Sequence, residues 1–496
     1  MDLSVAQAPA DHSRPGRAAS QPHVALSIAG GIALAVAAFA IYRLTFVERY
    51  YDHFVWQASA FLEGQAGIRY PVLDSAERFG NYLFQDVLPI ARTGGSERAL
   101  IPFPPLPAVL LLPFVAAFGL RADDQLIFTV LAAVDVALCW WMIGRLGVST
   151  VVRVGTTVLF AFGTVFWYTA QNTTTWYQAH IVSVGLTMLA VGVALSGDEA
   201  AGARTSTAGA SGPGTSTAGT STAGRSAAPS RRMRTALLSG ALIGLASTAR
   251  LTVILATPFF LIVGPRMDWR RRAVPVLVGA AIPVLALLGY NIVSTGHVFH
   301  PAYDHLYQLE ASAYTGLGYH PDWAAEDPRY VPQNIGIMLF STPRLFPDRF
   351  QDTLGTVNRP LCATPGATRG LFDVDCPVAL PRDTGMSVLL TTPALLLAIP
   401  AWFDRRRRRI VVACLLAILL VSFVNLMHFS QGWVQFGYRF SNDVVPFALV
   451  LVAIGFARLV DRPSPRAWAM PLAMGLIVLS VAINAWGVLW GRFLGW

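Results

Sequence analysis

The chain has 496 residues, of which 54% are hydrophobic and only 13% are charged, and its formal net charge is +9. A soluble protein of this length would carry about 25% charged residues, and several apolar runs here reach the ~20 residues that cross a bilayer. The composition therefore excludes an ordinary soluble domain and predicts a polytopic, all-α membrane protein. Because cytoplasmic loops of membrane proteins collect arginine, the positive charge does not indicate nucleic-acid binding.

The N-terminus is a polar, arginine-bearing tail of residues 1–23, and the first apolar run follows at 24–46. This run is long and lacks a small-residue cleavage site, so we predict a retained span and not a removed signal peptide. Arginine clusters mark cytoplasmic loops, which places the N-terminus of this multi-pass protein in the cytoplasm and its C-terminus outside the cell membrane. The clusters are RRMR at 231–234, PRMDWRRR at 265–272, DRRRRR at 404–409 and RLVDRPSPR at 458–466.

The stretch RYYDHFVWQASAFLEGQ, residues 49–65, begins where the first span leaves the bilayer. Several of its apolar residues share one helical stripe, which predicts an amphipathic helix lying in the outer interface over residues 53–64. Asp52 stands at the head of this helix, where we expect its carboxylate to face water close to the lipid. Glu48 lies one helical turn earlier. A carboxylate in this place is either a solvated surface group or a catalytic base.

A second apolar stretch, IPFPPLPAVLLLPFVAAFGL at 101–120, has the length of a span. Its five prolines each remove a backbone donor, which is costly in lipid. If the stretch crossed the membrane, the arginines of 145–153 would lie outside, against the charge rule. We therefore predict a second juxtamembrane helix over 102–119, and the polar loop between the two helices holds Asp86.

With this assignment the sequence predicts about eleven transmembrane helices. They are 24–46, 125–144, 152–169, 176–196, 235–249, 251–264, 273–292, 385–403, 410–429, 443–459 and 467–490.

The spans divide into an N-terminal module over 24–196, with an outer loop at 47–124, and a C-terminal module over 235–496, with an outer loop at 293–384. Between the modules, residues 197–234 include the small-residue repeat TSTAGASGPGTSTAGTSTAG at 205–224. The repeat has no apolar face to bury, so this segment is predicted to be a disordered cytoplasmic linker.

The chain contains four cysteines, and their positions suggest two different roles. Cys139 and Cys414 fall inside apolar runs, where packing is the simplest role. Cys362 and Cys376 share one long polar loop, so a disulfide between them is expected if that loop lies in an oxidising compartment.

Polar and aromatic residues gather near the predicted outer ends of the spans, where ionisable groups are costly and indicate a functional site. For any single aromatic residue, membership of the interfacial belt is the simpler interpretation. Two of the charged residues, Arg439 and Asp443, stand four apart at a predicted helix end and are expected to pair there. The candidates are Trp176, Tyr177, His180, Arg250, Arg439 and Asp443.

Several segments resemble the GT-C superfamily of membrane glycosyltransferases, in particular the family 39-like branch with the protein O-mannosyltransferases and the aminoarabinose transferase of lipid A. DHFVWQASAFLEGQ and IPFPPLPAVLLLPFVAAFG look like the two juxtamembrane helices of those enzymes. WYQAH, LASTARLTVILATPFFL and FGYRFSNDVVPFALVLVA look like segments of bacterial members, so the resemblance covers most of the chain. The chain departs from the family's adjacent acidic pair, because Glu48 and Asp52 are separated by three residues, and Asp86 therefore stays a rival for the base.

The resemblance implies transfer of a sugar from a polyprenyl-phosphate donor to a glycan, lipid or protein acceptor of the cell envelope, at the outer face. Asp52, Asp86 or Glu48 would be the catalytic base of an inverting reaction. Arg250 or Arg439 would hold the carrier phosphate. The remaining candidates for substrate binding are Trp176, Tyr177, His180 and Asp443. No cofactor is implied with certainty; a divalent metal is compatible with the chemistry, but no ligand spacing in the sequence supports one.

Two other classes of protein fit a chain of this composition. A transporter or flippase is compatible with the number of spans, although the sequence has no half-to-half repeat of the kind that many transporters show. In a non-catalytic subunit of an envelope assembly, the acidic residues would be surface groups only.

Overall fold

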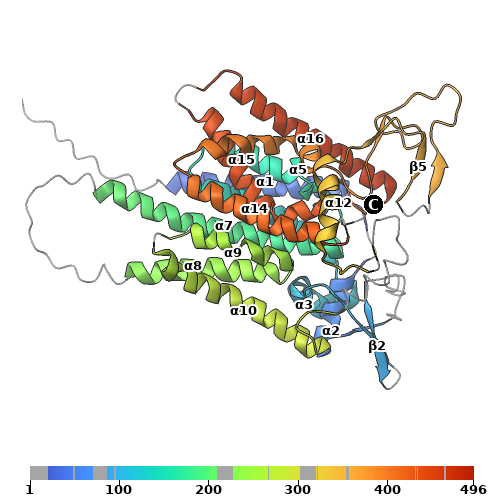
Figure 1. Cartoon of the computed structure of the whole chain (residues 1–496), viewed down its shortest axis with the longest axis horizontal. Helices are drawn as coiled ribbons and strands as arrows, with labels where there is room; N and C mark the ends of the chain where they lie inside the picture. The colour runs from blue at the N-terminus through green and yellow to red at the C-terminus, as the bar shows by residue number, and fades with distance from the viewer. Residues whose placement is uncertain are drawn as a thin grey trace, which may run out of the picture.

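A computed structural model shows a mostly helical protein whose helices pack side by side as one elongated bundle (Figure 1). Both large loops and the C-terminus lie at the same end of this bundle, as expected for loops on one side of a membrane. The structure describes residues 21–48, 51–70, 86–93, 96–208, 227–265, 267–301, 320, 322–353, 357–430, 432, 434–462 and 465–496.

Six helices within these ranges are long and apolar enough to cross a membrane, which supports the prediction of a membrane protein. They are, or lie within, α1 (Gln21–Thr45), α4 (Asp124–Gly144), α7 (Thr175–Ala208), α10 (Trp269–Thr295), α14 (Arg408–Met427) and α16 (Ala469–Leu494).

The other five predicted spans form shorter or less apolar helices, so the total of eleven stays a prediction. Residues 152–169 divide into two helices because α5 ends at Gly163, and prolines at 393 and 400 accompany a tight 3₁₀ helix in place of a long α-helix. The first half of α8 carries three arginines, which lowers its hydropathy. The elements are α5 (Thr150–Gly163), α6 (Phe166–Gln171), α8 (Ala227–Ser247), η4 (Leu251–Ala256), α9 (Thr257–Ile262), α13 (Val388–Thr391), η8 (Pro393–Phe403) and α15 (Val445–Val460).

The loop at 47–124, predicted to lie outside and still called the first outer loop here, contains the two expected helices, α2 (His53–Leu62) and α3 (Leu106–Phe118), which pack against each other. α2 is not the amphipathic surface helix that its sequence predicts, because its polar Gln57 is fully buried and donates to the Tyr290 hydroxyl at 3.2 Å. The turn η2 (Gly119–Arg121) follows α3. The loop also forms a small sheet in the order β1-β3-β2, from Ile68–Arg69, Ser96–Leu100 and Leu88–Thr93.

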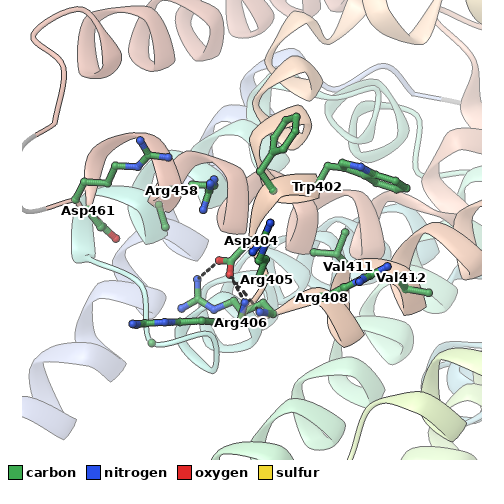
Figure 2. Close-up of a pocket in the computed structure, with 14 residues that line it drawn as sticks. Trp402, Asp404, Arg405, Arg406, Arg408, Val411, Val412, Arg458 and Asp461 are labelled. Carbon is green, nitrogen blue, oxygen red and sulfur yellow. Dashed lines mark hydrogen bonds and ion pairs between the residues drawn. The ribbon is translucent and has the colours of Figure 1, made fainter.

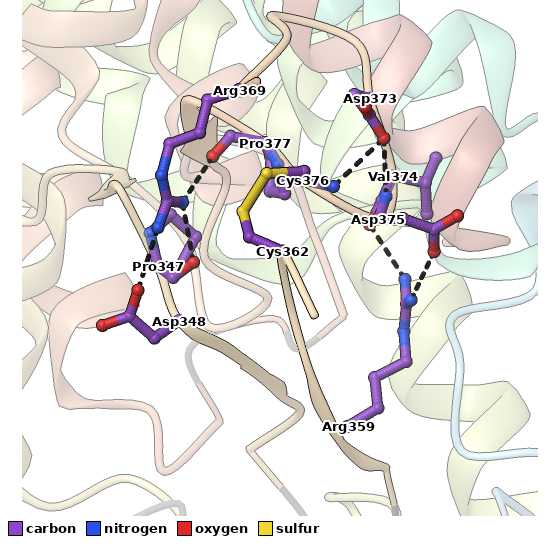
Figure 3. Close-up of a disulfide and its surroundings, with 10 residues drawn as sticks. All are labelled: Pro347, Asp348, Arg359, Cys362, Arg369, Asp373, Val374, Asp375, Cys376 and Pro377. Atoms are coloured by element: carbon purple, nitrogen blue, oxygen red, sulfur yellow. Dashed lines mark hydrogen bonds and ion pairs between the residues drawn. A yellow bond between two sulfur atoms is a disulfide. The ribbon is translucent and has the colours of Figure 1, made fainter. Parts of the chain in front are cut away.

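Within the second outer loop, Cys362 and Cys376 form a disulfide, which confirms the predicted pair (Figure 3). Around it, Arg359 donates to Asp375 at 2.7 Å, and Arg369 donates to Asp348 at 2.9 Å. Cys139 and Cys414 are buried and free, as their apolar surroundings predict.

Short elements make up the rest of this second loop. They are η6 (Pro328–Tyr330), α12 (Val331–Ile335), the π-helical turn η7 (Gly336–Phe340), the pair β4 (Arg344–Leu345) with β7 (Ala379–Leu380), and the pair β5 (Arg349–Gln351) with β6 (Asn358–Pro360). Leu361 and Leu380 of this loop pack on Trp490 of α16, which attaches the loop to the bundle.

α8 and α10 form a close helix pair in the C-terminal half, because glycines replace side chains at their contact. A Cβ atom added at Gly240 would meet the carbonyl oxygen of Val276, and one added at Gly279 would meet that of Leu237. Gly244 stands one turn further along α8, against Ala280. This spacing of small residues lets two backbones approach directly, as in many membrane helix pairs.

The predicted linker over 197–234 is shorter than expected, since α7 continues to Ala208 and α8 begins at Ala227 (Figure 1). Most of the repeat at 205–224 and the tail at 1–20 lie outside the described residues.

Candidate functional site

Two polar clusters meet where the first turns of α7 pass the loops at one end of the bundle. His180 and Tyr177 belong to the same helix and face the second half of the chain, whereas Trp176 faces the first outer loop. The segment between α14 and α15, which includes the 3₁₀ turn η9 (Arg439–Asp443), supplies the opposing side chains.

The first cluster is centred on the Asp443 carboxylate, whose side chain is fully buried. Arg250 donates to both of its oxygens, at 3.2 and 2.9 Å, and His180 Nδ1 lies 2.9 Å from Oδ1. Asn425 and Thr252 donate to Oδ2 at 3.0 and 3.3 Å. The carboxylate therefore has all the hydrogen bonds that a buried charge requires.

The expected pairing of Arg439 with Asp443 is wrong. The two residues belong to η9, which has about three residues per turn, so positions four apart do not share a face. Asp443 pairs instead with Arg250, 193 residues earlier in the chain.

The second cluster is centred on Arg439, which is only 8% exposed. Its guanidinium lies 5.5 Å from the ring centroids of both Tyr177 and Phe440. Within the described part of the chain, its side chain has no ion pair, and its buried Nε has no hydrogen-bond partner. Gly432, with φ +90°, leaves room for that nitrogen, since a Cβ there would lie 2.8 Å from Nε.

The positive charge of Arg439 acts on the carboxylate of Asp86 in the first outer loop. Trp176 Nε1 donates to Asp86 Oδ2 at 2.9 Å, which fixes the half-buried carboxylate against α7. Burial raises the pKa of Asp86 to about 6, while the Trp176 hydrogen bond and the positive charge of Arg439 oppose the rise. The raised pKa brings the titration of this carboxylate closer to neutral pH than that of an ordinary aspartate.

Aromatic rings surround Trp176 on the side of the first loop. The ring centroids of Tyr51, His53 and Phe103 lie 5.3, 6.2 and 6.5 Å from that of Trp176. His53 Nδ1 is also 2.6 Å from the Thr175 hydroxyl, so α2 and the start of α7 are joined directly. The result is an aromatic wall next to the Asp86 carboxylate.

The other two proposed carboxylates lie elsewhere. Asp52 is 2% exposed at the head of α2, so the expectation that it faces water is wrong. The hydroxyls of Thr174 and Thr175 donate to the backbone oxygen of Tyr51, at 2.7 and 3.2 Å, and this contact places the start of α7 over the head of α2. Glu48 is exposed after the end of α1.

Sequence reasoning missed two members of the Asp443 cluster, Asn425 and Thr252. Asn425 is the one strongly polar side chain near the end of an apolar run, FVNLM, and that isolation was a usable signal. Thr252 gave no such signal, because threonine is common in membrane helices. Among the described residues, no group of three or more His, Cys, Asp or Glu side chains could hold a metal ion.

No protein-family model, curated protein or solved structure matches this chain.

Proposed function

We propose that this protein is an integral-membrane glycosyltransferase that moves a sugar from a polyprenyl-phosphate donor to an envelope acceptor. The observation that carries the proposal is the buried guanidinium of Arg439, which has no ion pair with any described residue and lies within the electrostatic range of the Asp86 carboxylate. The resemblance of the loop helices and the outer segments to GT-C enzymes supplies the reaction class.

A buried cation without a partner favours an anionic ligand, because a charge removed from water is costly until it is paired. The planar guanidinium binds phosphate oxygens in a bidentate manner, which suits the phosphate of a lipid-linked sugar. Arg250 is less suited to this role, since Asp443 already holds it through two hydrogen bonds. We assign Arg439 to the carrier phosphate and Arg250, His180 and Asp443 to the positioning of η9.

Asp86 is the proposed base, because a base is most effective when its pKa lies near the working pH. The acceptor oxygen attacks C1 of the sugar from the face opposite the phosphate, and its proton passes to Asp86. The bond from C1 to the phosphate oxygen breaks at the same time, and the electron pair leaves with the phosphate, whose charge Arg439 stabilises. Tyr177 and the aromatic wall around Trp176 provide ring faces for the sugar.

The test is transfer of radiolabelled sugar from polyprenyl-phosphate donors to envelope fractions by the purified protein in liposomes. We expect Asp86→Asn to lower the transfer rate by roughly 10²–10⁴-fold with folding intact. Glu48→Gln is the matched control, because Glu48 is exposed, and it should keep the full rate. Asp52→Asn tests the rival base.

Loss of transfer in Asp52→Asn alone would move the base to Asp52. If all three carboxylate variants keep transfer, the catalytic assignment fails and a transporter or flippase of a lipid-linked or small-molecule substrate becomes the better hypothesis. Reporter fusions after residue 122 and within the repeat, at 215, test the sidedness: the proposal requires an outer signal at 122 and a cytoplasmic signal at 215.

A further inference from the structure

A second charged region lies at the opposite end of the bundle, about 30 Å away along the 20 residues of α14. There an open cavity of about 1010 Å³ is lined by the end of η8, the start of α14 and the end of α15 (Figure 2). Its volume matches that of sites for sizeable ligands. The cavity is remote from Asp86 and Arg439, so any ligand that it binds is independent of the proposed transferase reaction.

Six arginines line this cavity, and five of them have no partner among the described residues. Within the described residues, Arg407 alone approaches a carboxylate, with Nη1 3.8 Å from Asp404 Oδ2, and it also donates to the Leu146 carbonyl at 2.8 Å. The others have no ion pair or hydrogen bond from their side chains in the described chain. They are Arg405, Arg406, Arg408, Arg458 and Arg462.

Both carboxylates that line the cavity accept hydrogen bonds from backbone amides. Asp404 Oδ1 accepts from the backbone nitrogens of Arg406 and Arg407, at 3.0 and 3.2 Å (Figure 2). Asp461 accepts from the backbone nitrogen of Ser149 at 3.1 Å. These acids fix the turns that present the arginines, and they leave a large excess of positive charge facing the cavity.

Exposed apolar side chains border the arginines. Trp402 and Phe403 are 67% and 61% exposed, and Val412 is 45% exposed. Tryptophan next to arginine is typical of the boundary between headgroups and acyl chains. The general preference for cytoplasmic arginine explains basic residues at this end, but it does not predict that they surround one cavity with an apolar border.

We propose that this cavity binds the phosphate-bearing headgroup of an anionic phospholipid, with Trp402 and Phe403 against the acyl chains. Phosphate oxygens match the guanidinium groups in charge and geometry. Basic pockets between membrane helices bind such headgroups in other proteins. A free phosphate would satisfy the arginines equally well but would leave the apolar border without a contact, which is why we choose the lipid.

The experiment compares binding of phosphatidylglycerol and of cardiolipin with that of phosphatidylcholine, by native mass spectrometry of the full-length protein in detergent. We expect Arg405→Gln/Arg458→Gln to weaken binding of both anionic lipids by about 25-fold, at roughly five-fold for each arginine. The control Arg270→Gln/Arg271→Gln removes two exposed arginines that do not line the cavity and should change binding less than about two-fold.

Two further arms separate the lipid from a soluble anion. Trp402→Ala should weaken binding of the anionic lipids while leaving that of inorganic phosphate unchanged, and this outcome supports the lipid. Full displacement of phosphatidylglycerol by inorganic phosphate at equal concentration would overturn the proposal in favour of a soluble anion. Equal retention of phosphatidylcholine, or equal losses in the cavity and control variants, would overturn it as well. Unchanged elution in size-exclusion chromatography confirms that each variant is folded.

Discussion

Arg250 and Arg439 lie against the same ring, yet they belong to two regions of opposite character. Their guanidinium carbons are 5.1 and 5.5 Å from the centroid of Phe440. Arg250 is fixed by the Asp443 carboxylate, which is shared with His180, Asn425 and Thr252. Arg439 has no anion within ion-pair distance among the described residues, although it is the more buried of the two.

The difference separates a structural charge from one that is available to a ligand. The Asp443 carboxylate joins segments from α7, α14 and the turn before η4. Both of its oxygens accept hydrogen bonds, so the carboxylate has little capacity left for a substrate. An unpaired buried charge contributes no such bond, and its burial costs free energy. We therefore expect such a charge to be kept where it binds a ligand. Variants at the two clusters should therefore change different measurements.

Removing the Asp443 carboxylate should give the largest effect on stability. Asp443→Ala leaves Arg250 and His180 without their acceptor in a buried place, which costs about 3–5 kcal/mol of unfolding free energy. The measurement is the midpoint of thermal unfolding in detergent. Asp348→Ala is the control, because Asp348 is 90% exposed and its pair with Arg369 contributes little. Equal shifts for the two variants would contradict the structural role of the Asp443 cluster.

Replacing Arg439 should reverse this pattern. Arg439→Gln removes no ion pair or side-chain hydrogen bond to the described residues and loses only the ring contacts with Tyr177 and Phe440, so we expect the unfolding free energy to fall by less than about 2 kcal/mol. Binding of a polyprenyl phosphate should weaken by roughly 10–150-fold, because a hydrogen bond to a charged group contributes about 1.5–3 kcal/mol. Arg250→Gln is the matched comparison, and it should lower stability. If Arg250→Gln alone weakens phosphate binding, the two roles are exchanged.

A single hydrogen bond of the Asp443 cluster should have a smaller effect. Thr252→Val removes the donor at 3.3 Å from Oδ2 and keeps the shape of the side chain. We expect a loss of about 1 kcal/mol in unfolding free energy. Thr252→Ser retains the hydroxyl and should keep most of the stability. A loss of sugar transfer with unchanged stability would instead place Thr252 in the substrate site.

The smallest expected effect is the dependence of protein stability and of the transfer rate on pH, through the protonation of Asp86. Its folded-state pKa of about 6 lies above the usual 3.8, so the folded protein holds a proton that the unfolded chain releases. Between these values the contribution of Asp86 to stability falls as the pH rises. Transfer should rise with pH to a plateau above about 6, since a base must be deprotonated.

Trp176→Phe removes the hydrogen bond that lowers the pKa of Asp86, so the rising limb of the rate profile should move to higher pH. Tyr51→Phe is a control in the same aromatic wall that leaves this bond in place. An unchanged profile in Trp176→Phe would show that another group controls the rate.

The sequence was sufficient for the features that depend on local patterns. The apolar runs predict the long helices, and the sequence predicts a helix over 102–119 in the first outer loop. In the structure this helix begins at Leu106, four residues later than predicted, after the prolines of IPFPPLP. The rule that charges at membrane depth mark function selected His180, Arg250 and Asp443, which the structure brings together.

Features that depend on distant contacts could not be predicted. Asp52 is buried because α7 covers the head of α2. The two helices meet through His53 and Thr175, which are 122 residues apart in the chain. The partner of Asp443 lies 193 residues away. Strands of two or three residues, such as β1 and β7, are too short for any alternation of apolar and polar residues to appear.

The contact between α8 and α10 has an evolutionary consequence. Because carbonyl oxygens occupy the places where side chains would begin, substitutions at Gly240 and Gly279 would separate the two helices. Selection should therefore hold these positions constant among descendants of the same ancestor, as strictly as it holds the substrate site. When relatives are aligned, invariant glycines on α8 and α10 will record the distance between two backbones, and they should not be counted as evidence for catalysis.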